Sequence, residues 1–197
     1  MTRLLLIRHG ESTWNADGRW QGQADPPLSD LGVQQTLAAA AAVTDVDALW
    51  SSDLVRASST AELLVPPGVE VRLDPRVRER DAGEWTGLTR AEIDERYPGD
   101  LSARRSPPGF ERDEPLLARV RAAIDDIVET MTTDAFVLVV THGGVIRTIE
   151  RHLGAPSEPV PNLGGRVIEV RHGEIVLGER RLLIDPHDVT VTVPRQL

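Results

Sequence analysis

The chain of 197 residues contains no cysteine. It also contains no lysine, because all 22 of its basic residues are arginine. Without cysteine there is no thiolate nucleophile, no disulfide and no cysteine-ligated metal site. Without lysine there is no P-loop lysine, no Schiff-base lysine and no pyridoxal anchor. These two absences exclude several common catalytic chemistries before any motif is considered.

The chain also lacks long apolar runs and an excess of positive charge. The apolar run near the N-terminus, Leu4 to Ile7, is too short for the core of a signal peptide, and no run of 18 apolar residues occurs elsewhere. The net charge is −9, whereas nucleic-acid-binding proteins need a basic face to neutralise phosphates. We therefore expect a cytoplasmic protein with neither a membrane nor a nucleic acid as partner.

Apolar patterns typical of strands and helices alternate along most of the chain. We expect strands at residues 4–7, 47–51, 69–73, 136–140, 167–170 and 175–177, and helices at residues 31–43, 54–64, 90–96, 116–131 and 145–153. This order favours an α/β fold, a three-layer α/β/α sandwich with a mostly parallel central sheet and a late hairpin. The length fits one domain spanning residues 1–197.

The stretch from about residue 74 to 115 interrupts this alternation. It contains five prolines, is dense in charge, and holds one expected helix at residues 90–96. We interpret it as a small cap-like insertion over the C-terminal edge of the strands. Near the end of the chain, the alternating segment 189–193 is compatible with either an edge strand or a contact surface.

Two histidines, His9 and His142, each follow a buried strand directly and precede a glycine. In open parallel sheets the ligand crevice lies outside the carboxyl ends of the strands, and glycine allows a backbone N–H to approach an anion closely. The Arg-His-Gly-Glu string at residues 8–11 recurs at residues 171–174, but the second copy lies between two alternating segments, as a hairpin turn does. We therefore place the candidate site at His9 and His142 and expect His172 to face solvent.

Further polar motifs follow in a fixed order along the chain. They are Arg8-His9-Gly10-Glu11-Ser12 with Asn15, Gln21-Gly22, Pro27-Leu28-Ser29, Ser51-Ser52-Asp53-Leu54 with Arg56-Ala57 and Thr60-Ala61, Arg78-Glu79, Gly83-Glu84-Trp85-Thr86-Gly87, and Thr141-His142-Gly143-Gly144. Each motif alone is common, but the ordered set is specific. From Leu4 to about Val170 the chain resembles the histidine phosphatase superfamily, also called phosphoglycerate mutase-like.

The resemblance implies that His9 is the nucleophile that becomes phosphohistidine and that Glu79 protonates the leaving alcohol. It also implies a set of residues that bind the phosphoryl group, namely Arg8, Arg56 and His142, assisted by Asn15, Gln21, Gly22 and Gly143. Phosphoryl transfer depends mainly on positioning and on stabilising charge, and guanidinium groups match phosphate oxygens well. No cofactor and no metal is implied.

The resemblance leaves three functions open. We favour a histidine acid-type phosphatase acting on a small phosphomonoester, because residues 83–87 resemble the phosphatase branch and the insertion is short. A cofactor-dependent phosphoglycerate mutase is the alternative, although such mutases tend to carry a lysine among their substrate contacts. A non-catalytic phosphate-binding relative is the third. The expected partner is a small phosphorylated metabolite, and a homodimer is left open.

One departure from the family pattern concerns the end of the insertion. Many relatives have a Pro-Gly-Gly-Glu-Ser type of stretch there, whereas this chain has Pro107-Pro108-Gly109-Phe110-Glu111-Arg112. We interpret Phe110 as an apolar group over the pocket that affects substrate choice.

Overall fold

A computed structural model describes residues 1–132, 134–156 and 158–194. Its central sheet has the strand order β3-β2-β4-β1-β5-β6. The strands are β1 (Thr2–Arg8), β2 (Ala48–Ser51), β3 (Val71–Leu73), β4 (Phe136–Thr141), β5 (Gly164–Arg171) and β6 (Glu174–Leu182). Strands β1 to β4 are mutually parallel, and β5 and β6 join antiparallel at one edge. The expected α/β fold with a mostly parallel sheet is confirmed.

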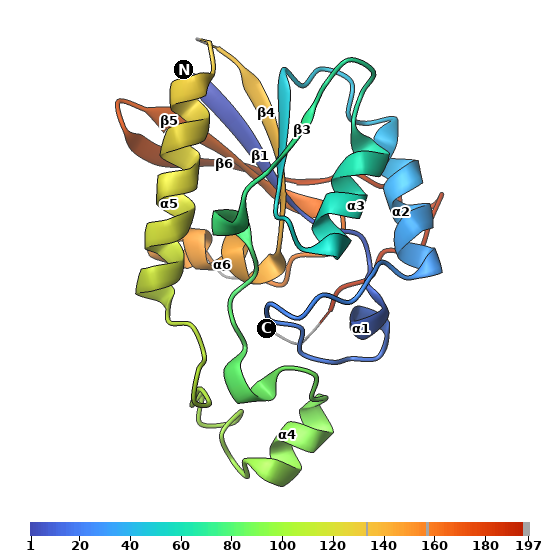
Figure 1. The fold of residues 1–197 in the computed structure, drawn as a ribbon, viewed down its shortest axis with the longest axis vertical. Helices are drawn as coiled ribbons and strands as arrows, with labels where there is room; N and C mark the ends of the chain where they lie inside the picture. Colours follow the sequence, from blue (N-terminus) through green and yellow to red (C-terminus); the bar gives the residue numbers. More distant parts are fainter. Residues whose placement is uncertain (133, 157, 195–197) are drawn as a thin grey trace.

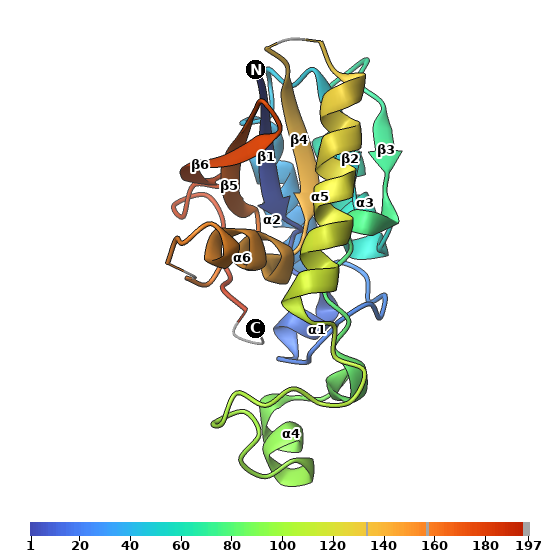
Figure 2. The same ribbon diagram turned by 90° about the vertical axis from the view of Figure 1, so that its left-hand side faces the viewer.

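Helices cover both faces of this sheet (Figures 1 and 2). They are α1 (Thr13–Ala16), α2 (Asp30–Ala40), α3 (Val55–Leu64), α4 (Arg90–Arg96), α5 (Asp113–Thr130) and α6 (Gly143–His152). Alternate residues of β1 point to opposite faces, so Leu4 and Leu6 pack with α5 and α6, whereas Leu5 and Ile7 pack with α2 and α3. The continuous apolar run at residues 4–7 therefore reflects burial on both faces, as expected for a central parallel strand.

Several element ends differ from the prediction, and the largest differences have identifiable causes. Helix α2 ends at Ala40 rather than at residue 43, because the chain continues in turns with Ala42 and Val43 donating to carbonyls three residues back. Helix α5 begins at Asp113, before Pro115, because a proline in the first turn needs no N–H donor. The hairpin strands are longer than expected, since glycines at their ends and interior weaken the strand pattern.

The hairpin turn contains the second Arg-His-Gly-Glu copy. His172 and Gly173 have φ values of 50° and 80°, which is the left-handed geometry of a tight hairpin turn, and residues 171–174 are exposed. The expectation that His172 faces solvent is confirmed. Segment 189–193 forms no strand: Thr190 and Thr192 accept hydrogen bonds from Gln35 of α2, so the segment is a contact surface.

The insertion extends beyond the carboxyl ends of the parallel strands, with α4 at its far end (Figure 2), and we call residues 74–115 the cap. It begins after β3 with the short 3₁₀ helix η1 (Pro75–Val77), and a second, η2 (Gly83–Trp85), precedes α4. The cap has a small core of its own, in which Trp85 packs edge-on against Trp20 with ring centroids 5.0 Å apart. Because Trp20 belongs to the segment between β1 and α2, this contact ties the cap to the main body.

Within the described ranges, no helix combines the length and the apolar character needed to span a bilayer.

Candidate active site

The two candidate histidines lie side by side because β1 and β4 are neighbouring parallel strands in register. Arg8 pairs with Thr141 at the last position of the ladder, so the next residue of each strand is a histidine. The rings of His9 and His142 meet edge to face, with centroids 5.1 Å apart and an interplanar angle of 62°. Strand order thus assembles two residues that are 133 positions apart in the sequence.

A cavity opens at this point, and most of the predicted residues line it. The predicted residues in its lining are Arg8, His9, Asn15, Gln21, Gly22, Arg56, Glu79 and Gly143. His142 is fully buried next to His9. The lining also contains residues that were not predicted as site residues, namely Arg19, Trp20, Gly144, Arg147, Val160 and Pro194.

The imidazole of His9 is held with one nitrogen directed to the backbone and the other toward Arg56. Its Nδ1 lies 2.6 Å from the Gly10 carbonyl oxygen, which makes Nδ1 the protonated nitrogen. The Arg56 Nε donates to Nε2 at 3.2 Å, so Nε2 carries the lone pair. Burial, together with the charges of Arg56 and Arg8, holds the pKa of His9 well below its usual range. The neutral ring is therefore available as a nucleophile at Nε2.

Several buried polar atoms at the cavity lack a hydrogen-bond partner. Among the described residues, five buried side-chain nitrogens are without one, and four of them belong to Arg8, Asn15 and His142. Buried polar atoms are normally satisfied, so a cluster of exceptions around one cavity indicates a binding site for a polar ligand. Burial, followed by the charge of Arg56, also holds the pKa of His142 well below its usual range.

Two of the four arginines that line the cavity, Arg8 and Arg56, are buried. Arg56 is completely buried, and its two terminal nitrogens donate to the carbonyl oxygens of Ala24 and Gly22 at 2.7 and 2.9 Å. Burial lowers the pKa values of Arg8 and Arg56 to about 10, so both remain cationic at neutral pH. An acidic chain therefore presents a local cationic pocket that suits a single phosphate better than a polyanion.

Glu79 reaches the same cavity from the segment that follows η1. Its Oε1 accepts the Arg80 N–H at 2.7 Å and its Oε2 accepts the Gly144 N–H at 3.0 Å. The carboxylate thus lies at the N-terminus of α6, where a negative charge is favourable. Glu79 and His9 line the same cavity, so a carboxyl group and a neutral imidazole are present together in the site.

The supporting residues were only partly accessible from the sequence. Thr60 lies one helical turn after Arg56, accepts the Gly10 N–H at 3.0 Å and donates to the Arg56 carbonyl at 2.7 Å. That spacing was a usable signal. Asn162, whose Nδ2 donates to the His9 carbonyl at 2.8 Å, carried no comparable signal.

Phe110 lines a pocket that adjoins the cavity, together with Gly144 and Arg147, and its effect on substrate choice stays a prediction. Its ring packs on Trp85 with centroids 6.0 Å apart and lies next to the Arg80 guanidinium. It therefore belongs to the small core of the cap and does not line the cavity that contains His9.

In the described part of the chain, histidine, aspartate and glutamate side chains nowhere gather into a group of three or more that could hold a metal ion.

Comparisons with known proteins identify related phosphatases. A glucosyl-3-phosphoglycerate phosphatase of Mycolicibacterium vanbaalenii is 38% identical over 178 residues, which cover 83% of this chain and 79% of the relative. A metal-independent phosphoserine phosphatase of Arabidopsis thaliana is 33% identical over 200 residues, which cover 94% of this chain and 80% of the relative.

The structure of a mycobacterial glucosyl-3-phosphoglycerate phosphatase complexed with VO3 superposes with a TM-score of 0.81 at 32% identity, covering 90% of this chain and 97% of the other. The sequence profile of the histidine phosphatase superfamily (branch 1) matches residues 4–177. The chain therefore belongs to the histidine phosphatase superfamily.

Proposed function

We propose that the protein is a phosphatase that hydrolyses a small phosphomonoester through a phosphohistidine at His9. The observation that carries the proposal is the neutral His9 ring, whose Nε2 accepts a hydrogen bond from Arg56 and which lines a cavity beside two buried arginines and four unpartnered nitrogens. Family membership and the two phosphatase relatives support the same reaction.

In the first step, His9 Nε2 attacks phosphorus and the bond between phosphorus and the alcohol oxygen breaks. Arg8, Arg56 and His142 stabilise the charge on the transferring phosphoryl oxygens. Glu79 in its acid form gives its proton to the departing oxygen, because an alkoxide is a poor leaving group.

In the second step, the Glu79 carboxylate takes a proton from water, and the resulting hydroxide attacks phosphorus. The bond between phosphorus and Nε2 breaks, inorganic phosphate leaves and His9 returns to its neutral form. Asn15, Gln21, Gly22 and Gly143 line the cavity and would assist in holding the phosphate. The reaction begins and ends with the same protein and consumes one water.

We further propose that the alcohol half of the substrate carries a negatively charged group. Two additional arginines, Arg19 and Arg147, line the cavity beyond the pair that would hold the phosphate. Arg147 also lines an adjoining pocket with Arg80 and Arg151. The substrates named for the two relatives, glucosyl-3-phosphoglycerate and phosphoserine, each contain a carboxylate. Cationic side chains beyond the phosphate suit such a group.

The decisive experiment is phosphate release from a panel of phosphomonoesters, comparing the parent protein with His9→Ala and His172→Ala. Both histidines lie in an Arg-His-Gly-Glu string, so His172→Ala is the matched control. We expect His9→Ala to abolish release and His172→Ala to leave it unchanged. Release that survives in His9→Ala contradicts the mechanism, and interconversion of phosphoglycerates without net release supports the mutase instead.

Four further expectations stay predictions. They are a cytoplasmic location, a metal-independent reaction, a single domain with its cap at about residues 74–115, and a homodimer as an alternative to a monomer.

A further inference from the structure

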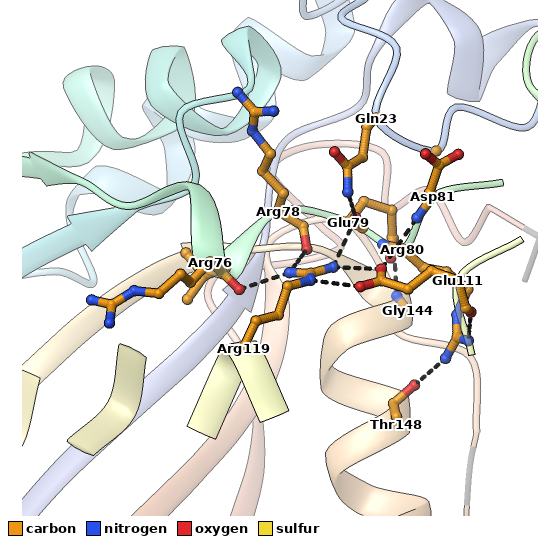
Figure 3. Close-up of polar contacts among 12 residues, drawn as sticks. Gln23, Arg76, Arg78, Glu79, Arg80, Asp81, Glu111, Arg119, Gly144 and Thr148 are labelled. Atoms are coloured by element: carbon orange, nitrogen blue, oxygen red, sulfur yellow. Dashed lines mark hydrogen bonds and ion pairs between the residues drawn. The ribbon is translucent and has the colours of Figure 1, made fainter. Parts of the chain in front are cut away.

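Arg119 of helix α5 binds the backbone of the segment that carries Glu79. Its Nη1 donates to the carbonyl oxygens of Arg76 and Arg78, both at 2.7 Å, and its Nη2 donates to the carbonyl oxygen of Glu79 at 3.1 Å (Figure 3). One side chain therefore binds three carbonyl oxygens of residues 76–79. Residues 78 and 79 follow η1 and belong to neither a helix nor a strand. The Glu79 carbonyl is further held by Gln23, whose Nε2 donates to it at 3.3 Å.

The same guanidinium also binds Glu111, which lies near the C-terminal end of the cap. Its Nε and Nη2 donate to the two carboxylate oxygens of Glu111, both at 2.8 Å, in the parallel two-bond arrangement that gives arginine–carboxylate pairs their directionality. The Glu111 backbone N–H in turn donates to the Asp81 carbonyl at 3.0 Å. Arg119 thus connects helix α5 with both stems of the cap.

All five N–H donors of the Arg119 guanidinium are used in these contacts. Arginine offers five donors in a fixed planar fork, whereas lysine offers three on a single nitrogen. Three carbonyl oxygens and two carboxylate oxygens use all five donors of the guanidinium and cannot all be satisfied by an ammonium group. The arrangement therefore fixes the position of the Glu79 backbone specifically, which is more than a charge balance with Glu111 requires.

Two hydrogen bonds set the position of the Glu79 carboxylate relative to this anchored backbone. The Glu79 carboxylate is set by the N–H groups of Arg80 and Gly144, and the Arg80 N–H belongs to the same anchored segment. A shift of the segment would move the carboxyl group away from the leaving oxygen. We propose that Arg119 is a positioning residue for the proton transfer by Glu79; this inference rests on the acid role given to Glu79 above.

The test compares two substrates that differ in how much acid catalysis they need. An alkyl phosphate such as 2-glycerol phosphate needs a proton on its leaving oxygen, whereas p-nitrophenyl phosphate releases a stable phenolate. We expect Glu79→Gln to reduce kcat/KM on the alkyl ester by about 100-fold and on the aryl ester by less than about 10-fold. The ratio kcat/KM reports the step that releases the alcohol and leaves out the second step, in which Glu79 acts as the base for both esters. We expect Arg119→Lys to reduce kcat/KM on the alkyl ester about 10-fold through kcat, with a smaller loss on the aryl ester and little change in KM.

A control variant and a second route guard against a general loss of structure. Arg121 lies on the same helix and binds Asp125 four residues on. Arg121→Lys is therefore the matched control and should leave the activity on both substrates unchanged. Glu111→Gln removes the charge of the carboxylate that Arg119 binds. It should shift the ratio of the two activities in the same direction as Arg119→Lys. Melting curves identify any variant whose activity loss follows from unfolding.

The double variant Glu79→Gln/Arg119→Lys separates positioning from general stability. If Arg119 acts through Glu79, Arg119→Lys adds no further loss once the carboxyl group is absent. Equal losses of kcat/KM on both esters in Arg119→Lys, or additive losses in the double variant, overturn the positioning role while leaving the function intact. Equal losses of kcat/KM on both esters in Glu79→Gln overturn the acid role itself, and the positioning role with it.

Discussion

The carboxylate of Glu79 lies directly against the α-carbon of Gly144. Its Oε2 accepts the Gly144 N–H at 3.0 Å, and a β-carbon at residue 144 would lie 2.2 Å from Oε1. No real β-carbon approaches an oxygen so closely, so the contact requires glycine. The first turn of the helix that follows His142 therefore admits the Glu79 carboxylate, because residue 144 has no β-carbon.

Gly144→Ala is expected to displace the Glu79 carboxyl group. A displacement of about 1 Å can cost on the order of 100-fold in rate, so we expect kcat on an alkyl phosphate to fall by about 10- to 100-fold. Loss on an aryl phosphate should be smaller, because its leaving group needs less protonation. Gly178→Ala in β6, where a β-carbon would lie 3.1 Å from Val167, is the matched control and should not change the ratio of the two activities.

The pH dependence of stability should report the two buried histidines. Burial, assisted by Arg56, holds the pKa values of His9 and His142 well below the ordinary value, whereas in the unfolded chain both titrate near 6.5. As the pH falls below about 6.5, the unfolded chain takes up more protons than the folded one, so stability present above that pH is lost. The loss approaches about 1.4 kcal/mol per pH unit for each histidine.

Urea unfolding between pH 7.5 and pH 5.5 measures this effect. The free energy of unfolding should decrease steadily toward acid in the parent protein and less steeply in His142→Gln. His187→Gln, at an exposed histidine of the tail, should keep the parent slope. A parent stability that stays constant across this interval would show that the folded state protonates these rings as readily as the unfolded chain.

The sequence predicted those parts of the site that lie at strand ends or in ordered motifs. His9 and His142 were predictable because each follows an apolar strand, and the parallel pairing of those strands brings them together. Asn162 and Arg119 were not, because both act on backbone carbonyls of distant segments, and a carbonyl acceptor carries no residue type. Arg147 could have been found, since it lies one helical turn beyond Gly144 and hence on the same face.

The fold was predictable to a similar depth. Strong periodicity located the strands and most helices, but the four-residue helix α1 was missed because it is too short to show a period. The tail at residues 189–193 alternates like a strand, yet its hydrogen bonds go to Gln35 and Asn162 rather than to a neighbouring strand. Alternation within a segment predicts which of its side chains are buried, but it does not predict which residues the segment contacts.

Glu150 should contribute to stability without contributing to catalysis. Its carboxylate is completely buried on α6 and accepts hydrogen bonds from Arg166 at 2.8 Å and Arg180 at 2.6 Å, which join α6 to the hairpin. Removing one partner of a buried ion pair leaves uncompensated charge, at a cost of about 3 kcal/mol. Glu150→Gln is therefore expected to lower the free energy of unfolding by about this amount, with kcat close to that of the parent.

A neighbouring pair provides the control for Glu150. Arg180 also lies 3.6 Å from Glu158, whose side chain is 72% exposed. Exposed ion pairs contribute little, so Glu158→Gln should change the free energy of unfolding by less than about 0.5 kcal/mol. Equal effects of the two substitutions in urea unfolding would mean that burial does not govern the strength of this network.

Arg147 should select substrates by the charge of their alcohol half. Phosphoserine and phosphoethanolamine differ only by a carboxylate, so their comparison isolates the contribution of that group. If Arg147 binds the carboxylate, Arg147→Gln raises KM for phosphoserine by about 10-fold, because a charge-assisted hydrogen bond contributes roughly 1.5 kcal/mol, and leaves KM for phosphoethanolamine nearly unchanged. The kcat values should change little, since the carboxylate is bound equally before and during the reaction. Parallel increases in KM for both substrates would place Arg147 with the phosphate rather than with the alcohol half.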